Sequence, residues 1–239
     1  MNEPVQKLPL RPPRKATAKV TSQTVRTKII KSPSRTNDPV RTMAGILEVA
    51  RQEFGEKGLA GARVDAIAAA TQTSKRMIYY YFSSKEGLYL ATLEEYYRRI
   101  RSIEADLHLE DLEPVQALRT LVAFTYDHHY GNEQFVRIVM SENMNRGQYM
   151  LQSKHIQALN ETAISGLAKL YERGVIAGVF RKNLDPIDIH ASISALTFFN
   201  VSNQHTFGLI FKQDIRSAAY QAKRRSNVVE LIVRFVCAP

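Results

Sequence analysis

Apolar side chains recur every three or four residues along nearly the whole chain after residue 37, a spacing that is typical of amphipathic α-helices. The first apolar stripe consists of Met43, Leu47, Ala50 and Phe54. We expect its helix to begin at Asn37-Asp38-Pro39, which offers an N-cap and a first-turn proline, and to end at Gly58. No segment shows the strict alternation of a strand, so the pattern predicts an all-α fold.

Longer helices follow. Ser83 is expected to cap a helix that reaches about residue 107, with Glu86 at the third position of a capping box. Arg98, Arg99 and Arg101 of this helix are expected on its outer faces. The helix that begins near residue 114 is apolar on two faces, which is typical of a central position in a bundle. Further helices are expected over residues 134–143, 149–177, 186–211 and 214–236.

Two short amphipathic helices stand between the first long helix and the second, joined by a tight turn near residues 71–73. In the second of them, Arg76, Tyr79 and Tyr80 share one face, while Ile78 and Phe82 point the other way. A helix that is basic and aromatic outside and apolar behind suits an anionic surface. The pair has the geometry of a helix-turn-helix, whose second helix enters the DNA major groove.

The segments ILEVARQEFGEKG (residues 46–58), VDAIAAAT and SKRMIYYYFSSKEGL resemble the amino-terminal domain of the tetracycline-repressor (TetR/AcrR) family. The resemblance covers roughly residues 38–100. It implies a three-helix helix-turn-helix DNA-binding domain over residues 37–83 and a helical bundle for ligand binding and dimerisation over residues 84–239. The chain departs from the family pattern in two places: Gln72-Thr73 replaces Gly-Val in the turn, and Ala62-Arg63 stands where a Ser or Thr cap is usual.

Double-stranded DNA is therefore the expected partner of this first domain. Ser74, Lys75, Arg76 and Tyr80 are expected to approach base edges, and Arg76 is expected to read guanine because its planar fork matches O6 and N7. The residues expected to hold phosphates are Arg63, Tyr79, Tyr81 and Lys85, with Thr73 of the turn beside them.

Charge is concentrated at the start of the chain. Residues 1–36 hold nine Lys or Arg residues and one acid, so they account for +8 of the net charge of +10. They also hold five of the nine prolines and no aromatic residue, so we expect a disordered basic tail that adds non-specific attraction to phosphates. The alternative is an over-long start without a role.

Cys237 is the single cysteine, which fits a reducing cytoplasm, and no run is long and apolar enough for a signal peptide core or a membrane span. Neither HExxH, nor a glycine-rich phosphate loop, nor Cys-x-x-Cys occurs. We therefore predict no catalytic residue, no metal and no cofactor.

The second domain offers polar and aromatic residues within apolar helical contexts, which are candidates for a ligand pocket. The candidates are His128, Arg137, Asn143, Tyr149, Phe199, Asn200 and Asn203. The alternative for each is an ordinary core or surface group. In the resembled family the last two long helices form the dimer interface, and here Ile189, Ile193 and Leu196 are suited either to that role or to the core. Either the dimer interface or the core is likewise the expected place of Val228, Leu231, Ile232 and Phe235.

The sequence thus predicts a cytoplasmic, homodimeric and ligand-responsive regulator, a repressor released from a palindromic operator by a small effector. Residues 114–211 loosely resemble family members that control degradation of aromatic or nitrogen-heterocyclic acids, so an acid of this kind is the expected effector. The sequence leaves two alternative functions: an architectural DNA-binding protein that binds no effector, and a small helical enzyme.

Overall fold

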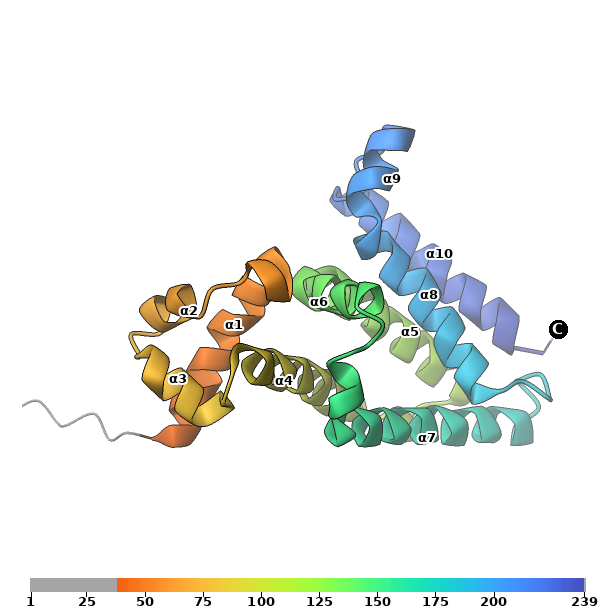
Figure 1. The fold of residues 1–239 in the computed structure, drawn as a ribbon. Helices are drawn as coiled ribbons and strands as arrows, with labels where there is room; N and C mark the ends of the chain where they lie inside the picture. Colours follow the sequence, from red (N-terminus) through yellow and green to blue (C-terminus); the bar gives the residue numbers. More distant parts are fainter. Residues whose placement is uncertain (1–37, 239) are drawn as a thin grey trace, which may run out of the picture. The chain divides into compact units, whose positions relative to one another are not determined.

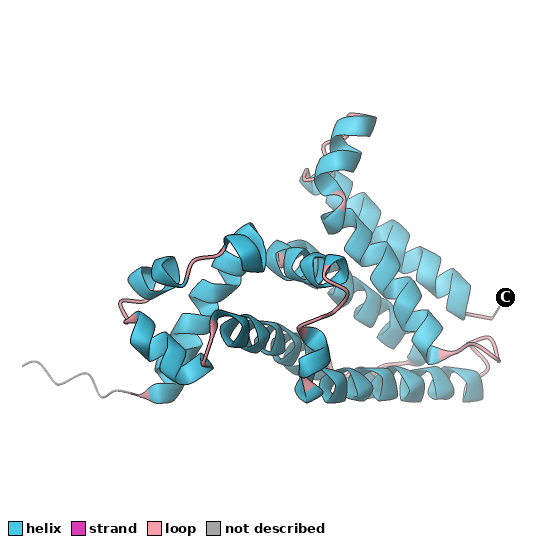
Figure 2. Cartoon of the chain, viewed as in Figure 1, coloured by secondary structure: helices cyan, strands magenta, loops and turns pink. Residues whose placement is uncertain are grey.

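The computed structural model describes residues 38–238, and the basic tail predicted over residues 1–36 lies outside them. The described residues are largely helical, as the apolar spacing predicts, and they form no β-strand (Figure 2). A single β-bridge joins Phe180 to Cys237. Within residues 38–238, no helix has the length and apolarity that a membrane crossing requires.

The chain order of the helices is shown in Figure 1. The amino-terminal helices are α1 (Pro39–Gly61), α2 (Val64–Ala70), α3 (Lys75–Phe82) and α4 (Lys85–Ala105). The rest are η1 (Leu109–Asp111), α5 (Pro114–Gly131), α6 (Glu133–Met144), η2 (Met150–Gln152), α7 (Lys154–Ile176), α8 (Pro186–Ser202), α9 (Gln204–Phe211) and α10 (Ala218–Val236). The two η elements are short 3-10 helices.

Helix α1 begins as predicted, because the Asp38 carboxylate accepts the N–H groups of Val40 and Arg41. Gly58 interrupts its regular geometry with a φ of 65°, and a short helical stretch continues beyond it. The predicted cap of α4 is wrong by one residue. Ser84, not Ser83, accepts the Gly87 N–H at 3.0 Å, while Ser83 has a φ of 64° and ends α3.

The absence of the predicted capping box follows from that shift, because Glu86 now stands at the second position of α4 instead of the third. The helix predicted over residues 186–211 is also wrong in one respect, since it breaks at Asn203 into α8 and α9. Asn203 has φ −107° and ψ 7°, outside helical geometry, and its amide nitrogen donates to the Ser202 hydroxyl at 2.8 Å. The apolar spacing continues through this break, so periodicity alone does not reveal it.

The buried apolar residues form two clusters. The first joins α1 to α4 with α6 and contains the fully buried side chains of Ile46, Ile67 and Ile78 together with Val136 of α6. The second joins α5, α7, α8 and α10. Helices α1 to α3 therefore share a core with α6, which lies beyond the predicted domain boundary at residue 83.

Helix α6 packs closely against α1 at Gly55, a residue that contributes no side chain of its own. A Cβ atom on Gly55 of α1 would lie 2.5 Å from the Cβ of Gln134. Beside this contact, Arg137 Nε donates to the Gly55 carbonyl at 2.6 Å and its terminal nitrogen donates to the Glu56 carbonyl at 3.0 Å. These carbonyls precede the break at Gly58, so Arg137 supplies donors for the end of the regular part of α1.

Gly55→Ala is expected to destabilise the fold by about 1–3 kcal/mol, because the added methyl group must push α6 away from α1. Gly45→Ala is the matched control in the same helix, where a Cβ meets nothing within 4 Å and is expected to add about 0.5–1 kcal/mol of stability. Chemical denaturation of both variants measures the difference. Equal stabilities would contradict the close α1–α6 contact.

Candidate functional site

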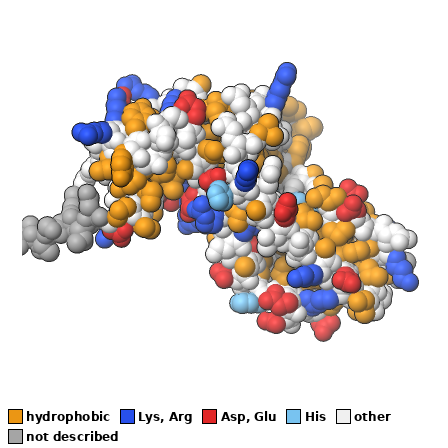
Figure 3. All heavy atoms as spheres, turned by 60° about the horizontal axis from the view of Figure 1, so that its bottom comes forward, with side chains coloured by type: hydrophobic (Ala, Val, Ile, Leu, Met, Phe, Trp, Pro, Cys, Tyr) orange, Lys and Arg blue, Asp and Glu red, His pale blue; other side chains and the backbone are white. Residues whose placement is uncertain are grey.

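Helix α3 presents a polar and aromatic face and buries an apolar one. Ser74 caps it by accepting the Met77 N–H at 3.2 Å, and Ile78 is fully buried against the first core cluster. Tyr79 and Tyr80 are 42% and 78% exposed, so two aromatic rings stand on the solvent side of a short helix. On the side of the molecule drawn in Figure 3, Lys and Arg side chains lie beside hydrophobic side chains at the end formed by α1 to α3.

The nine residues predicted to contact DNA fall into two groups by exposure. Arg63, Ser74, Lys75, Arg76, Tyr79 and Tyr80 are exposed, and Thr73, Tyr81 and Lys85 are partly buried. Their contact with DNA stays a prediction. The turn before α3 has the left-handed geometry that glycine usually supplies, since Gln72 has a φ of 53°.

The cations of this face differ in their partners. Asp65 of α2 forms an ion pair with Lys75 and lies 3.6 Å from Arg63. Lys85 donates to the Ala60 carbonyl at 3.3 Å. Among the described residues Arg76 has neither a carboxylate nor a carbonyl partner, so its guanidinium is available to a base edge without breaking an existing contact.

Helix α2 lacks a side-chain cap, but Glu53 of α1 binds the backbone of Arg63, the residue that precedes the helix. The Glu53 carboxylate accepts the Arg63 N–H at 2.9 Å and pairs with Lys57 at 2.7 Å. Burial raises the pKa of Glu53, but these hydrogen bonds and the two neighbouring cations outweigh it and hold the pKa below its usual value. The sequence analysis does not assign this role to Glu53. The available signal was an acidic residue directly beside Phe54 of the apolar stripe.

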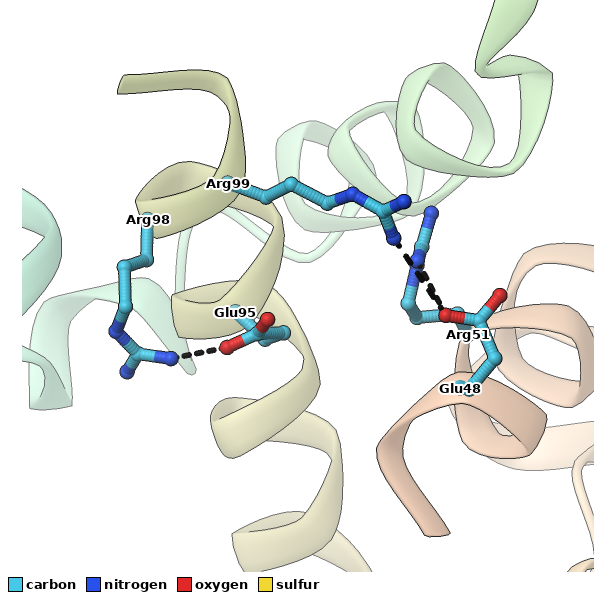
Figure 4. Close-up of polar contacts among 5 residues, drawn as sticks. All are labelled: Glu48, Arg51, Glu95, Arg98 and Arg99. Atoms are coloured by element: carbon cyan, nitrogen blue, oxygen red, sulfur yellow. Dashed lines mark hydrogen bonds and ion pairs between the residues drawn. The ribbon is translucent and has the colours of Figure 1, made fainter. Parts of the chain in front are cut away.

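Charged groups also join α1 to α4 (Figure 4). Glu48 of α1 lies 2.7 Å from Arg51 and 3.5 Å from Arg99 of α4, whereas Arg98 pairs with Glu95 within α4. The Arg51 guanidinium carbon also stands 4.5 Å from the centre of the Tyr96 ring. Opposite charges and a cation–π contact therefore hold the first helix to the fourth.

A cavity of about 250 Å³ lies among residues of α4, α5, α6, α7 and α8. Its polar lining consists of Arg101, Glu104, Thr125, His129, Asn160, His190 and Ser194. Aromatic rings of Tyr97, Phe135 and Phe198 and several aliphatic side chains complete it. A second hollow of about 500 Å³ shares Arg101, Glu104 and Leu121 with the first, so the two adjoin.

Arg101 and Glu104 form an ion pair whose side chains are only 14% and 19% exposed. The expectation that Arg101 lies on an outer face is therefore wrong, because Glu104 one turn later compensates its charge and permits its burial. Burial raises the pKa of Glu104 although Arg101 opposes that shift. Arg101 Nε has no hydrogen-bond partner among the described residues, so this guanidinium retains a donor inside the protein.

Two histidines of α5 are held neutral by their surroundings. Burial, His128, His190 and Arg101 together lower the pKa of His129 to about 3, and burial and nearby arginines lower the pKa of His128 to about 4. His129 Nδ1 lies 2.9 Å from the Thr197 hydroxyl oxygen of α8. His129 lines the cavity, whereas His128 does not.

None of the seven residues predicted to bind ligand lines this cavity. His128 packs edge-on against Phe135, Arg137 holds α1, Asn143 donates to the Val139 carbonyl, and Tyr149 packs edge-on against Tyr89. Phe199 is 43% exposed, Asn200 accepts from Arg224 at 3.1 Å, and Asn203 contacts Ser202. Sequence reasoning chose His128 and Phe199, and the cavity is lined by their neighbours His129 and Phe198.

Two family models match the chain. One, described as "Bacterial regulatory proteins, tetR family", matches residues 46–92, and the other, "Tetracyclin repressor-like, C-terminal domain", matches residues 114–232. The chain is 34% identical over 194 residues to the HTH-type transcriptional repressor NicS of Pseudomonas putida, with 81% of this chain and 92% of NicS covered. The chain belongs to the TetR family of bacterial transcriptional regulators. Both the predicted family and the all-α fold with an amino-terminal helix-turn-helix are thus confirmed.

Other TetR-family proteins are similar at lower identity. The chain is 29% identical over 174 residues to the repressor AcnR of Corynebacterium glutamicum, covering 63% of this chain and 92% of AcnR. A solved bacterial regulatory protein of the tetR family from Rhodococcus superposes with a TM-score of 0.64 at 21% identity, covering 83% of this chain and 99% of that chain. These likenesses extend over both the helix-turn-helix and the bundle that follows it.

Arg76→Ala is expected to weaken operator binding by about 1–3 kcal/mol and to relax preference at one base position in each half-site, because a bidentate contact to guanine is lost. Binding selection from a random DNA library, followed by titration with the selected duplex, measures both effects. Arg98→Ala is the control, since its side chain is 57% exposed and pairs with Glu95 of the same helix. Unchanged affinity and base preference in Arg76→Ala would show that α3 reads DNA through other residues.

Proposed function

We propose that the chain is a homodimeric transcriptional repressor that leaves a palindromic operator when a small aromatic or heterocyclic acid enters the cavity. The observation that carries this proposal is the buried guanidinium of Arg101 in a cavity with aromatic walls. Arg101 belongs to α4, the helix that directly follows the DNA-reading helix α3 in the chain. The repressor names of two relatives support the direction of the regulation.

An acid suits this cavity on electrostatic grounds. Arg101 is always charged, and in a poorly solvated site its strongest partner is a carboxylate, which it binds in a bidentate manner. In the free protein that partner is Glu104. An effector carboxylate competes with Glu104 for the guanidinium, whose Nε has no hydrogen-bond partner among the described residues. Tyr97, Phe135 and Phe198 offer rings against which a flat effector packs.

The same helices that line the cavity also hold α1. Helix α4 contributes Arg101 to the cavity and Arg99 to the pair with Glu48. Helix α6 contributes Phe135 to the cavity and Arg137 to the carbonyls of α1. An effector that shifts either helix therefore acts on the DNA-binding part through contacts already in place, provided that it binds the two arrangements with different affinity.

Dimerisation is proposed through the last helices. Ile189, Ile193, Val228 and Ile232 are buried within the chain and belong to its own core. The exposed large apolar side chains of the same region are Ile187, Phe199, Leu209, Ile210, Phe211 and Leu231. Their concentration in α8, α9 and α10 supports a second copy of the chain as the covering surface, as is typical of the family.

The two other functions have less support. In an architectural DNA-binding protein that binds no ligand, a cavity with aromatic walls and a buried arginine would have no function. An enzyme is not supported by the relatives, which are transcriptional regulators. Moreover, residues 38–238 contain no group of three or more His, Cys, Asp or Glu side chains placed to hold a metal ion.

The test compares the wild type with Arg101→Met/Glu104→Gln, which removes both members of the buried pair so that neither charge is left alone. Release from a selected operator duplex is titrated with a panel of aromatic and pyridine carboxylates, and light scattering counts the chains on each duplex. The double variant is expected to bind the operator within threefold of wild type, as an even number of chains, and to need at least tenfold more acid for release.

Arg98→Met is the matched control, because Arg98 lies one turn earlier on α4 and is 57% exposed. It is expected to respond to the acids as the wild type does. If the double variant responds to the acids as the wild type does, Arg101 does not bind the effector. Binding of single chains to the duplex would contradict the dimer.

A further inference from the structure

The hydrogen bond between Thr197 and His129 has a direction. The Thr197 hydroxyl oxygen is 2.8 Å from the Ile193 carbonyl oxygen and 2.9 Å from His129 Nδ1, and the threonine is 1% exposed. A hydroxyl group has one hydrogen, and a helical threonine commonly donates it to the carbonyl four residues earlier. When the hydroxyl hydrogen is donated to that carbonyl, the hydroxyl oxygen is left to accept from His129, and we infer that the ring carries its hydrogen on Nδ1.

This hydrogen bond leaves the other ring nitrogen as an acceptor. A neutral histidine has one N–H group, so a hydrogen on Nδ1 means that Nε2 has a free lone pair. Burial and the neighbouring His128, His190 and Arg101 keep the pKa of His129 at about 3, so the ring is neutral at ordinary pH. Nε2 has no hydrogen-bond partner among the described residues, and the ring lines the cavity.

Arg101 and His129 therefore make different demands on an occupant of the same cavity. The guanidinium is a donor with a positive charge, whereas Nε2 of the histidine accepts a hydrogen bond and carries no charge. We infer that the effector is an acid with a second polar group that donates a hydrogen bond: its carboxylate binds Arg101, and a hydroxyl or ring N–H donates to His129 Nε2. Thr197 acts as a positioning residue, since it selects the tautomer. This inference rests on the proposed function and narrows the class of acid.

The opposite requirement would follow from the other tautomer. With the hydrogen on Nε2, His129 would favour an acceptor on the ligand, and acids that carry a hydroxyl group would gain nothing over acids with an acceptor of similar size. The buried Thr197 therefore determines which polar group the ligand must carry, although this threonine does not line the cavity. Specificity of this kind is strong because an unmatched polar group in a cavity loses its hydration without compensation.

The experiment uses three sets of carboxylates with the full chain: benzoate, the 3- and 4-hydroxybenzoates, and the corresponding formylbenzoates. A hydroxyl group both donates and accepts a hydrogen bond, whereas the carbonyl oxygen of a formyl group only accepts one. Calorimetric titration gives the affinity of each acid for the wild type, for Thr197→Val and for Thr197→Ser. Valine keeps the shape of the threonine and removes its oxygen, whereas serine keeps the oxygen.

One hydroxybenzoate is expected to bind the wild type and Thr197→Ser about tenfold more tightly than its formyl counterpart. In Thr197→Val this ratio is expected to fall below threefold, because the ring is free to place its hydrogen on Nε2. Nitrogen NMR of the free wild-type protein gives a direct second test, and it is expected to find the hydrogen of His129 on Nδ1.

Equal binding of hydroxy and formyl acids by the wild type would overturn this inference and leave an acid effector in place. A hydrogen on Nε2 in the free protein would overturn it as well. If no carboxylate of the panel binds, both this inference and the proposed effector class fail. The wild-type series and the NMR measurement do not depend on how well Thr197→Val folds.

Discussion

The packing of α6 on α1 is the contact on which the proposed regulation depends most. Gly55 allows the two helices to approach until a single methyl group would not fit between them. Arg137 crosses the same contact and donates to the Gly55 and Glu56 carbonyls, which the break at Gly58 would otherwise leave short of partners. A rigid joint of this kind passes displacement from one helix to the other, because closely packed surfaces do not deform gradually.

A second joint connects α1 to α4, through Glu48 and Arg99 and through Arg51 over the Tyr96 ring. Both joints end on helices that line the cavity, α4 with Tyr97 and Arg101 and α6 with Phe135. Helix α1 in turn holds the start of α2 through the Glu53 carboxylate, which accepts the N–H of Arg63 just before that helix. A continuous series of contacts thus leads from the cavity to the helix-turn-helix, and none of them depends on a side chain outside the described residues.

The helix-turn-helix could be predicted from the sequence because its determinants are local. A cap at Ser74, a buried Ile78 and exposed tyrosines one residue apart follow from the spacing within a single short helix. The sequence does not show which of two adjacent serines caps α4, because Ser83 and Ser84 have the same side chain. In the structure Ser83 has a positive φ and ends α3, so Ser84 is the cap.

The cavity could not be predicted in the same way. Helix α5 is apolar on two faces, and adjacent residues on a helix point about 100° apart, so sequence pattern does not tell which of His128 and His129 meets a cavity. The same holds for Phe198 and Phe199 of α8. The sequence predicts Arg101 on an outer face of its helix, because a lone arginine is rarely buried. The pair that it forms with Glu104, three residues later, was the signal available in the sequence.

We propose that α6 transmits occupancy of the cavity to α1 through Arg137. The measurement that tests it is the affinity of an effector acid for the free protein and for the operator-bound protein, in the wild type and in Arg137→Gln. The ratio of the two affinities gives the coupling between the sites, commonly between about 5-fold and 150-fold. The account predicts that Arg137→Gln reduces this ratio by at least threefold while the free protein binds acid and operator as the wild type does. A ratio equal to that of the wild type would contradict it.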